Sequence, residues 1–281
     1  MREVIVYFAP GNARSQLVGQ AMLRGIRNFD PTVQLISSQR YRGPNSRIAV
    51  FYGLSDGLRQ VFDDYRQDER RKAIYVDLGY WGRRKKTRFD GYHKISIDSR
   101  HPTGYFQTVE HPADRFRSHS IQIKPWREDG RHILVIGMSG KGALAEGFVP
   151  EQWERRTVMQ LRELTKRPIV YRPKPNWIGA KPIMGAAFQR ESPIEHALAD
   201  AWAVVCHHSN VAVEAILAGV PAICPLGVAS VMAGHRLEQI DAPPMPEGRE
   251  QWASDIAYCQ WTMAEMQSGA AWRHLRKEGL V

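Results

Sequence analysis

Polar side chains that could bind a diphosphate are concentrated in residues 204–222. The segment reads Val-Val-Cys-His-His-Ser-Asn-Val-Ala-Val-Glu-Ala-Ile-Leu-Ala-Gly-Val-Pro-Ala, so an apolar strand-like stretch ends in polar residues and a helical stretch begins at once. The first turn of a helix presents N–H groups without intrahelical partners and the positive end of the helix dipole, which favour a bound diphosphate. Glu214, on the first turns of this helix, could accept hydrogen bonds from a ribose diol. The segment predicts a nucleotide site, although an ordinary strand, turn and helix with Ser209 as N-cap would show the same pattern.

A second candidate lies in residues 169–175, Ile-Val-Tyr-Arg-Pro-Lys-Pro, which predict a strand that runs into a rigid basic turn. Arg172 and Lys174 could neutralise a diphosphate leaving group while the bond to it breaks. A basic turn that is simply solvated is the alternative interpretation.

Residues 137–142, Gly-Met-Ser-Gly-Lys-Gly, look like a Walker-type phosphate loop but lack two of its features. Residue 135 is Val where that motif begins with Gly, and Lys141 precedes Gly142 rather than Ser or Thr. We therefore do not expect a Walker-type NTPase. Ser139, Gly140 and Lys141 could still touch a phosphate or a sugar.

Asp77 is the first candidate for a general base. It could take a proton from a hydroxyl group of a second substrate, the acceptor, which would then receive the group that leaves the diphosphate. Asp77 follows the apolar run 73–76, and ligands of parallel α/β sheets bind outside the carboxyl ends of the strands. Asp90 and His93, in the stretch Arg-Phe-Asp-Gly-Tyr-His, are the next candidates, and an Asp77 that only caps a loop is the alternative. Because the sequence has no Asp-x-Asp signature, we expect no required metal.

Residues 79–89 interleave cationic and aromatic side chains next to Asp77. Cations can hold phosphates, and rings can stack on an extruded base or take its place. The segment therefore favours double-stranded DNA with a flipped, modified base as the acceptor, and a solvated basic loop is the alternative. The candidate acceptor residues are Tyr80, Trp81, Arg83, Arg84, Lys85, Lys86, Arg88 and, further along the chain, His101.

Short apolar runs alternate with amphipathic stretches and predict the elements that position these residues. Expected strands are residues 4–8, 33–36, 48–52 and 73–78 in the first half, and 132–136, 168–171, 203–206 and 222–224 in the second. Expected helices are residues 15–27, 54–65, 151–164, 193–199 and 211–218. Such repetition predicts an α/β fold in which two Rossmann-like parallel-sheet halves face a cleft. We place an acceptor-binding domain at 1–125 and a nucleotide-binding domain at 126–281, with the helical stretch 250–267 packed back on the first half.

The composition of the chain indicates which partners it could bind and in which compartment it could act. The net charge of +10 and the isoelectric point near 9.7 favour a polyanionic partner. Cys206, Cys224 and Cys259 are too few and too far apart for a disulfide framework or a metal cluster, which fits a reducing cytoplasm. No apolar run approaches the roughly 20 residues of a membrane span, and no signal peptide is recognisable. We therefore expect a cytoplasmic monomer with no membrane partner, in the host cytoplasm if a phage encodes it.

The segment 204–222 resembles the C-terminal nucleotide-binding motif of GT-B glycosyltransferases, in which a His- or Ser-bearing turn precedes a helix with a Glu-Ala pair and a Gly-x-Pro turn. The resemblance, which covers residues 132–230, implies a nucleotide-sugar donor, most simply a UDP-sugar, and needs no metal cofactor. It places His208 and Ser209 near the diphosphate and Glu214 on the ribose, with His207 and Asn210 beside them. The Arg-Pro-Lys-Pro turn is similar to the Arg-Pro-His-Pro turn of polysaccharide and polyol-phosphate transferases, with Lys174 where His is common.

The basic, aromatic loop makes the chain look like the phage enzymes that glycosylate hydroxymethylated pyrimidines in DNA. A saccharide or polyol-phosphate acceptor is the second hypothesis, which the Arg-Pro-Lys-Pro turn favours. A nucleic-acid-binding protein without enzyme activity is the third, and only the charge favours it.

Overall fold

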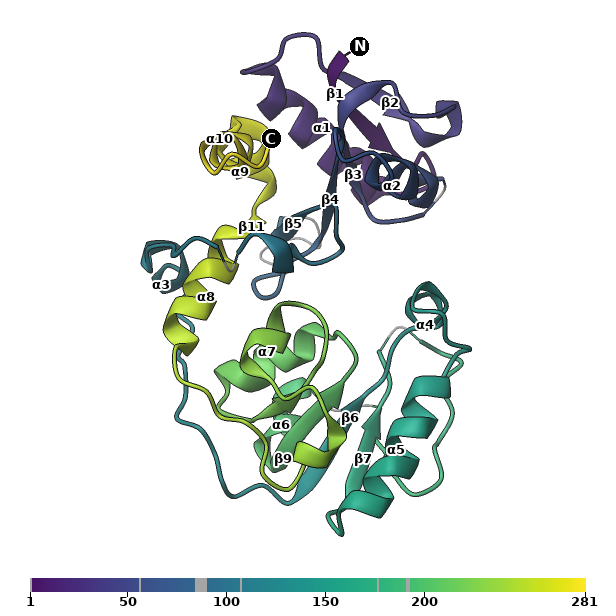
Figure 1. The fold of residues 1–281 in the computed structure, drawn as a ribbon, viewed down its shortest axis with the longest axis vertical. Coiled ribbons are helices and arrows are strands. Elements are labelled where there is room, and N and C mark those ends of the chain that lie inside the picture. The colour runs from purple at the N-terminus through teal and green to yellow at the C-terminus, as the bar shows by residue number, and fades with distance from the viewer. Residues whose placement is uncertain (1, 56, 84–89, 107, 176, 191–192) are drawn as a thin grey trace. The chain divides into compact units, whose positions relative to one another are not determined.

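The computed structural model describes residues 2–55, 57–83, 90–106, 108–175, 177–190 and 193–281. These residues form two compact units (Figure 1). The first unit comprises Met1–His119 together with Ser254–Val281, and the second comprises Ser120–Ala253. None of the helices in the described ranges combines the length and apolar character needed to cross a bilayer.

The sheet of the first unit has the strand order β11-β5-β4-β3-β1-β2. Its strands are β1 (Arg2–Phe8), β2 (Gln34–Ser37), β3 (Ser46–Tyr52), β4 (Lys72–Leu78), β5 (His93–Ile97) and β11 (Gln260–Trp261). Strands β1 to β4 pair in parallel, whereas β5 pairs antiparallel with both β4 and β11. The chain therefore closes one edge of this sheet with a strand from its C-terminal segment.

Both faces of this sheet are buried, as parallel strands require, so successive residues of β1 from Val4 to Tyr7 are all in the core. One face packs against α1 (Ala13–Arg27), α9 (Met263–Ser268) and α10 (Ala270–Lys277). The other face packs against α2 (Leu58–Arg66). The C-terminal helices α9 and α10 are thus part of the first unit's core (Figure 1).

The second unit has a parallel sheet with the strand order β10-β9-β6-β7-β8. Its strands are β6 (His132–Ile136), β7 (Ile169–Arg172), β8 (Ala187–Phe188), β9 (Ala201–Cys206) and β10 (Ala222–Ile223). Its helices are α4 (Gly140–Ala145), α5 (Gln152–Leu164), α6 (Ile194–Ala199) and α7 (Asn210–Leu217). Val158 and Leu161 of α5 pack on Ile133 and Val135 of β6, which explains the apolar spacing in the sequence.

The predicted α/β fold with two parallel-dominated sheets is confirmed, but the segment 250–267 is not one helix. Helix α8 (Arg249–Tyr258) ends before β11, and Thr262 then caps α9 by accepting a hydrogen bond from the Glu265 N–H at 3.2 Å. The Glu265 carboxylate reaches back to the Thr262 N–H at 2.8 Å and completes a capping box. Strand β5, whose residues His93 to Ser96 are buried, is not among the strands predicted from the sequence.

Candidate active site

The carboxyl ends of β9, β6 and β7 lie in one row across the second sheet. Ile136 of β6 is in register with Cys206 of β9 and with Arg172 of β7. The chain leaves β6 toward β7 on one side and later returns to β9 on the other, so β6 and β9 form a topological switch point. Ligands of open α/β sheets bind outside the strands at such a point. The segments that begin at Gly137, Pro173 and His207 therefore meet at the edge where a ligand is expected.

Helix α7 begins directly after β9, as the sequence predicts. The Ser209 hydroxyl accepts a hydrogen bond from the Val211 N–H at 3.2 Å, and the Ser209 carbonyl accepts one from the Ala212 N–H at 3.0 Å. Ser209 is therefore the N-cap, the role that the simpler interpretation gives it. Glu214 is half-buried and stands four residues after Asn210, so both residues share one face of the helix.

His207 and His208 form a polar cluster with Glu146 before this helix. The Nδ1 atoms of the two histidines are 2.8 Å apart, so one must carry a proton and the other a lone pair. His208 Nδ1 also lies 3.8 Å from a carboxylate oxygen of Glu146, which follows α4. The Phe148 and Trp153 rings pack on the His207 ring in T-shaped arrangements. These three polar residues are half-buried and offer ligand atoms within 4.8 Å of one another, so the two imidazoles could donate to a phosphate, or all three residues could hold an ion.

The loop after β6 is fixed by backbone hydrogen bonds and one buried carboxylate. The Gly137 N–H donates to the Arg172 carbonyl at 2.9 Å, which ties this loop to the end of β7. Ser139 caps α4 by accepting from the Gly142 N–H at 3.1 Å. A Cβ atom at Gly140 would lie 2.7 Å from the Trp177 ring, so only glycine fits there without a shift. Lys141 is exposed on the first turn of α4.

Glu154 of α5, the buried carboxylate that holds this loop, is not among the site residues predicted from the sequence. Its side chain accepts a hydrogen bond from the Met138 N–H at 2.6 Å although the residue is only 1% exposed, and burial raises the pKa of the carboxyl group. The signal was present, because Glu154 occupies the same helical stripe of α5 as Val158 and Leu161. An acidic residue within an apolar stripe indicates a buried hydrogen-bond partner.

Two of the predicted donor-site cations, Arg172 and Lys174, lie at the end of β7 and in the turn after it. Arg172 is buried, and burial lowers the pKa of its guanidinium, with Glu195 acting in the opposite direction. The pKa of the Cys206 thiol is lowered by its contact with Cys224 and, to a smaller extent, by the charge of Lys174. Lys174 is half-buried in the turn, two residues after Arg172.

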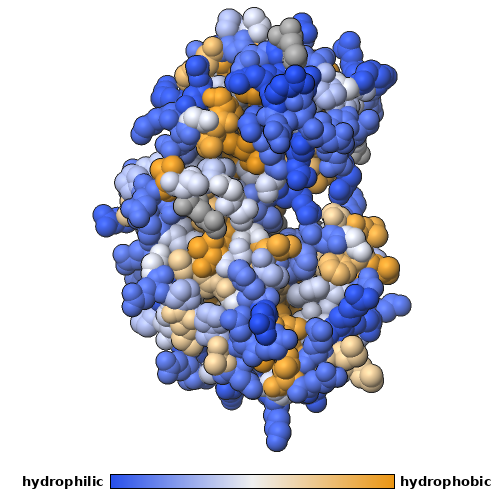
Figure 2. Space-filling view, in the orientation of Figure 1, coloured by the Kyte–Doolittle hydropathy of each residue, from blue (hydrophilic) through white to orange (hydrophobic). Residues whose placement is uncertain are grey.

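Exposed apolar side chains border the same loops. Leu144 on α4, Val149 after it, and Ile178 beyond the basic turn are each more than half exposed. Most of the face drawn in Figure 2 is hydrophilic, with apolar residues in separate patches. An apolar margin beside polar loops suits a ligand that carries both charge and ring faces.

In the first unit, Asp77 of β4 lies at the carboxyl end of the sheet. Its carboxylate accepts hydrogen bonds from the Tyr75 hydroxyl and from the Leu78 N–H, each at 2.8 Å. Burial, and then the charge of Asp77, raises the pKa of Tyr52 at the end of β3, whose hydroxyl accepts from Arg14 at 3.3 Å. Burial and the charge of Arg14 lower the pKa of His93 to about 4, so this ring is neutral at neutral pH. The structure thus gathers Arg14, Tyr52, Asp77 and His93, whereas Asp90 is half-buried in the turn before β5.

The predicted acceptor residues fall into three groups: buried aromatic residues, residues whose side chains contact other polar groups, and residues outside the described ranges. Tyr80 and Trp81 are 1% and 8% exposed, and the Trp81 ring packs edge-on against Phe116 and His119. The Arg83 guanidinium donates to the Gly79 and Tyr80 carbonyls, each at 2.9 Å. His101 Nδ1 lies 3.3 Å from Lys94 Nζ. Arg84, Lys85, Lys86 and Arg88 lie outside the described residues.

No family model matches the sequence, and no curated protein matches it. Solved structures do resemble the chain. The β-Kdo 2,7 transferase of KpsC from Thermosulfurimonas dismutans has 15% sequence identity and a TM-score of 0.55, over 96% of this chain and 99% of that one. The β-Kdo 2,4 transferase of the same KpsC has 13% identity and a TM-score of 0.53, over 91% and 90%. The likeness shows that the chain has the GT-B fold of these transferases.

Proposed function

We propose that this chain transfers a sugar from a nucleotide-sugar donor to a hydroxyl group of an acceptor, with the donor bound by the second unit. The observation that carries the proposal is the row of strand ends at the switch point, where Ile136 is in register with both Cys206 and Arg172. Each of these strand ends leads into a segment whose side chains or amide groups could bind a diphosphate or a sugar, as a nucleotide-sugar site requires.

Each group in this row has a role in the proposal. The amide end of α7, with His207 and His208, binds the diphosphate, and Glu214 on the same helix accepts hydrogen bonds from the ribose. Arg172 and Lys174 stabilise the negative charge that develops on the leaving nucleotide. Glu154 holds the Met138 amide and so fixes the loop that borders the donor.

Asp77 is the proposed general base on the acceptor side. Its carboxylate already accepts hydrogen bonds from Tyr75 and Leu78, which fix its orientation at the end of β4. A carboxylate held in this way can take a proton from a hydroxyl group that replaces or joins these donors.

A saccharide hydroxyl is the acceptor that the observations favour. The rings of Tyr80 and Trp81 are packed inside the first unit, so they are not displayed for stacking on a flipped base. The KpsC transferases named above act in Kdo transfer, which is carbohydrate chemistry. A hydroxymethylated pyrimidine in double-stranded DNA is the second candidate, because a net charge of +10 favours a polyanion.

One mass-spectrometric experiment tests the donor and the acceptor together. The chain is incubated with UDP-sugars and with nucleotide-activated Kdo, in parallel with oligosaccharides, polyol phosphates, and DNA that carries hydroxymethylcytosine or hydroxymethyluracil. A sugar-sized mass gain on a saccharide supports the first candidate, and a gain on DNA supports the second. Salt-dependent DNA binding without any transfer or donor hydrolysis would overturn the transferase proposal.

A further inference from the structure

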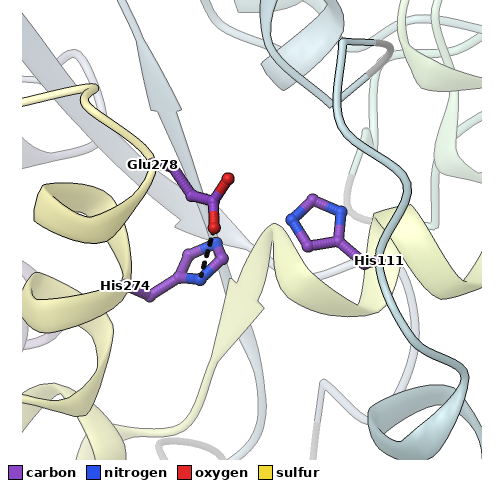
Figure 3. A group of neighbouring side chains, drawn as sticks. All are labelled: His111, His274 and Glu278. Atoms are coloured by element: carbon purple, nitrogen blue, oxygen red, sulfur yellow. Dashed lines mark ion pairs between the residues drawn. The ribbon is translucent and has the colours of Figure 1, made fainter.

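A cluster of two histidines and a carboxylate lies in the first unit, among residues that the proposed sugar transfer does not use. His274 and Glu278 stand one helical turn apart at the C-terminal end of α10, and His111 lies in the segment before α3 (Asp114–Arg117). Figure 3 shows the His111 ring opposite the His274 ring, with the Glu278 carboxylate beside His274. One ligand atom from each of the three residues lies within 4.8 Å of the others.

Asp255 orients His111 toward this cluster. Its Oδ1 atom lies 3.2 Å from His111 Nδ1 and accepts the His111 backbone N–H at 2.8 Å. A histidine that donates from Nδ1 to a carboxylate carries its lone pair on Nε2, where it can bind a metal. Such a hydrogen bond to a carboxylate is the usual second interaction of a metal-bound histidine. The ring also stacks on Tyr258, with centroids 4.6 Å apart and planes 17° apart, so its orientation is fixed on two sides.

His274 is the second imidazole, and it is buried next to Glu278. Its ring packs against Tyr258, with centroids 5.4 Å apart, and the Arg115 guanidinium lies over the same Tyr258 ring. The His274 Nε2 atom is buried and has no hydrogen-bond partner among the residues that the structure describes. Its Nδ1 atom lies 4.0 Å from Glu278 Oε1. The Arg115 charge is offset by Glu265, whose carboxylate it contacts at 2.7 Å.

We propose that His111, His274 and Glu278 bind a divalent transition-metal ion, for which zinc is the best fit, with water in a fourth position. Two imidazoles and one carboxylate are a ligand set typical of zinc, whereas calcium and magnesium require mainly oxygen ligands. The half-buried Glu278 offers the ion a path from solvent. A bound ion would join the segment around His111 to the C-terminal helix and so hold together two distant parts of the chain.

The test begins with chain stripped by a chelator and carrying His207→Gln, which disables the other candidate ligand group around Glu146. Titration with zinc alone is followed by calorimetry, and titration with cobalt(II) by visible absorption, which reports tetrahedral coordination. We expect one equivalent of zinc, a cobalt spectrum of tetrahedral type, and a higher thermal unfolding midpoint with zinc than without it. No zinc uptake by this background chain would overturn the proposal.

Ligand variants in the same background assign the site. His274→Gln and Glu278→Gln should each weaken zinc binding by at least about 100-fold, and Asp255→Asn, which removes only the orienting carboxylate, by about 10- to 100-fold. His196→Gln, on α6 of the second unit, is the matched control and should leave zinc affinity unchanged. Zinc affinity that none of the cluster variants alters would show that the ion binds elsewhere. If His274→Gln does not fold, the milder Asp255→Asn and the cobalt spectrum of the background chain still decide the question.

Discussion

Glu214 offers a test of the proposed donor site at the scale of one residue. Its carboxylate is half-buried on α7, so Glu214→Ala should remove charge-assisted hydrogen bonds to the ribose and leave the core intact. The loss should be about 1.5–3 kcal/mol of donor binding, or roughly a 10- to 150-fold higher dissociation constant. Calorimetric titration with the donor identified by mass spectrometry measures it. Glu163→Ala, an exposed glutamate on α5, is the control, and unchanged donor affinity in Glu214→Ala would remove this residue from the site.

His93 makes the stability of the first unit depend on pH. Its folded-state pKa of about 4 lies below the unfolded value near 6.5, so the unfolded chain binds more protons between these values. The contribution of His93 to the free energy of unfolding is therefore fully present above pH 6.5, and it is lost as the pH falls toward 4. The slope from one histidine is at most about 1.4 kcal/mol per pH unit.

Urea unfolding between pH 4 and pH 7 measures this effect. His93→Gln removes the titrating group and should flatten the dependence, although other histidines with lowered pKa values, such as His132, keep part of it. An identical pH dependence in the variant and the unaltered chain would show that His93 does not titrate in this window.

The parts of the candidate site that depend on one short segment of sequence could be predicted, because their residue types and spacing can be seen together. Residues 204–222 contain a strand end, an N-cap and a helix, so the position of Ser209 followed from local rules. The hydrogen bond from Met138 to Glu154 joins two elements, and the sequence offered only an acidic residue in an apolar stripe as its sign. The burial of Tyr80 and Trp81 depends on Phe116 and His119, which contact Trp81 from a later segment, so a loop that is rich in cations gave no sign of it.

At the scale of elements, the contact between α1 and the C-terminal helices can be tested at a single glycine. A Cβ atom at Gly25 would lie 1.9 Å from the Met266 carbonyl oxygen, which belongs to α9. In an exposed helix, replacing Gly by Ala stabilises the fold by about 1 kcal/mol. We expect Gly25→Ala to destabilise instead, by about 1–3 kcal/mol, because backbone must move to make room.

Gly19→Ala is the matched control in the same helix. Its new Cβ atom would meet the flexible end of Leu35 at 3.1 Å, so this variant should be close to neutral or slightly stabilising. Chemical denaturation followed by tryptophan fluorescence compares the two variants. Equal effects of the two substitutions would contradict the close packing of α9 on α1.

The longer parallel strands were predictable as elements, because each contains a short apolar run, whereas the two-residue parallel strand β8 was not predicted. The pairing of β5 with β11 was not, since Lys94 and Gln260 are in register although they lie far apart in the chain. Short strands of two residues, such as β11, have no periodicity to detect. The capping box of Thr262 and Glu265 was the local sign that the C-terminal helical stretch is interrupted.

At the scale of the whole molecule, the first unit depends on a segment from the other end of the chain. Met266, Trp272 and Leu275 belong to its hydrophobic core, and β11 pairs with β5. A chain that stops at Ala253 should therefore lose amide protection in β1 to β5 and keep it in β6 and β9, as hydrogen exchange followed by mass spectrometry would show. Full protection of the first sheet in the shortened chain would contradict this dependence.

The division of the first unit between two stretches of sequence also bears on the order in which the protein is made. A ribosome releases Ser120–Ala253 as one uninterrupted stretch, so the second unit can fold while translation is still under way. The first unit is begun earlier but finished later, because α9, α10 and β11 are translated after the second unit. Until then its apolar sheet face and the open edge of β5 are uncovered, and they are the surfaces on which a nascent chain would engage a chaperone or another copy of itself.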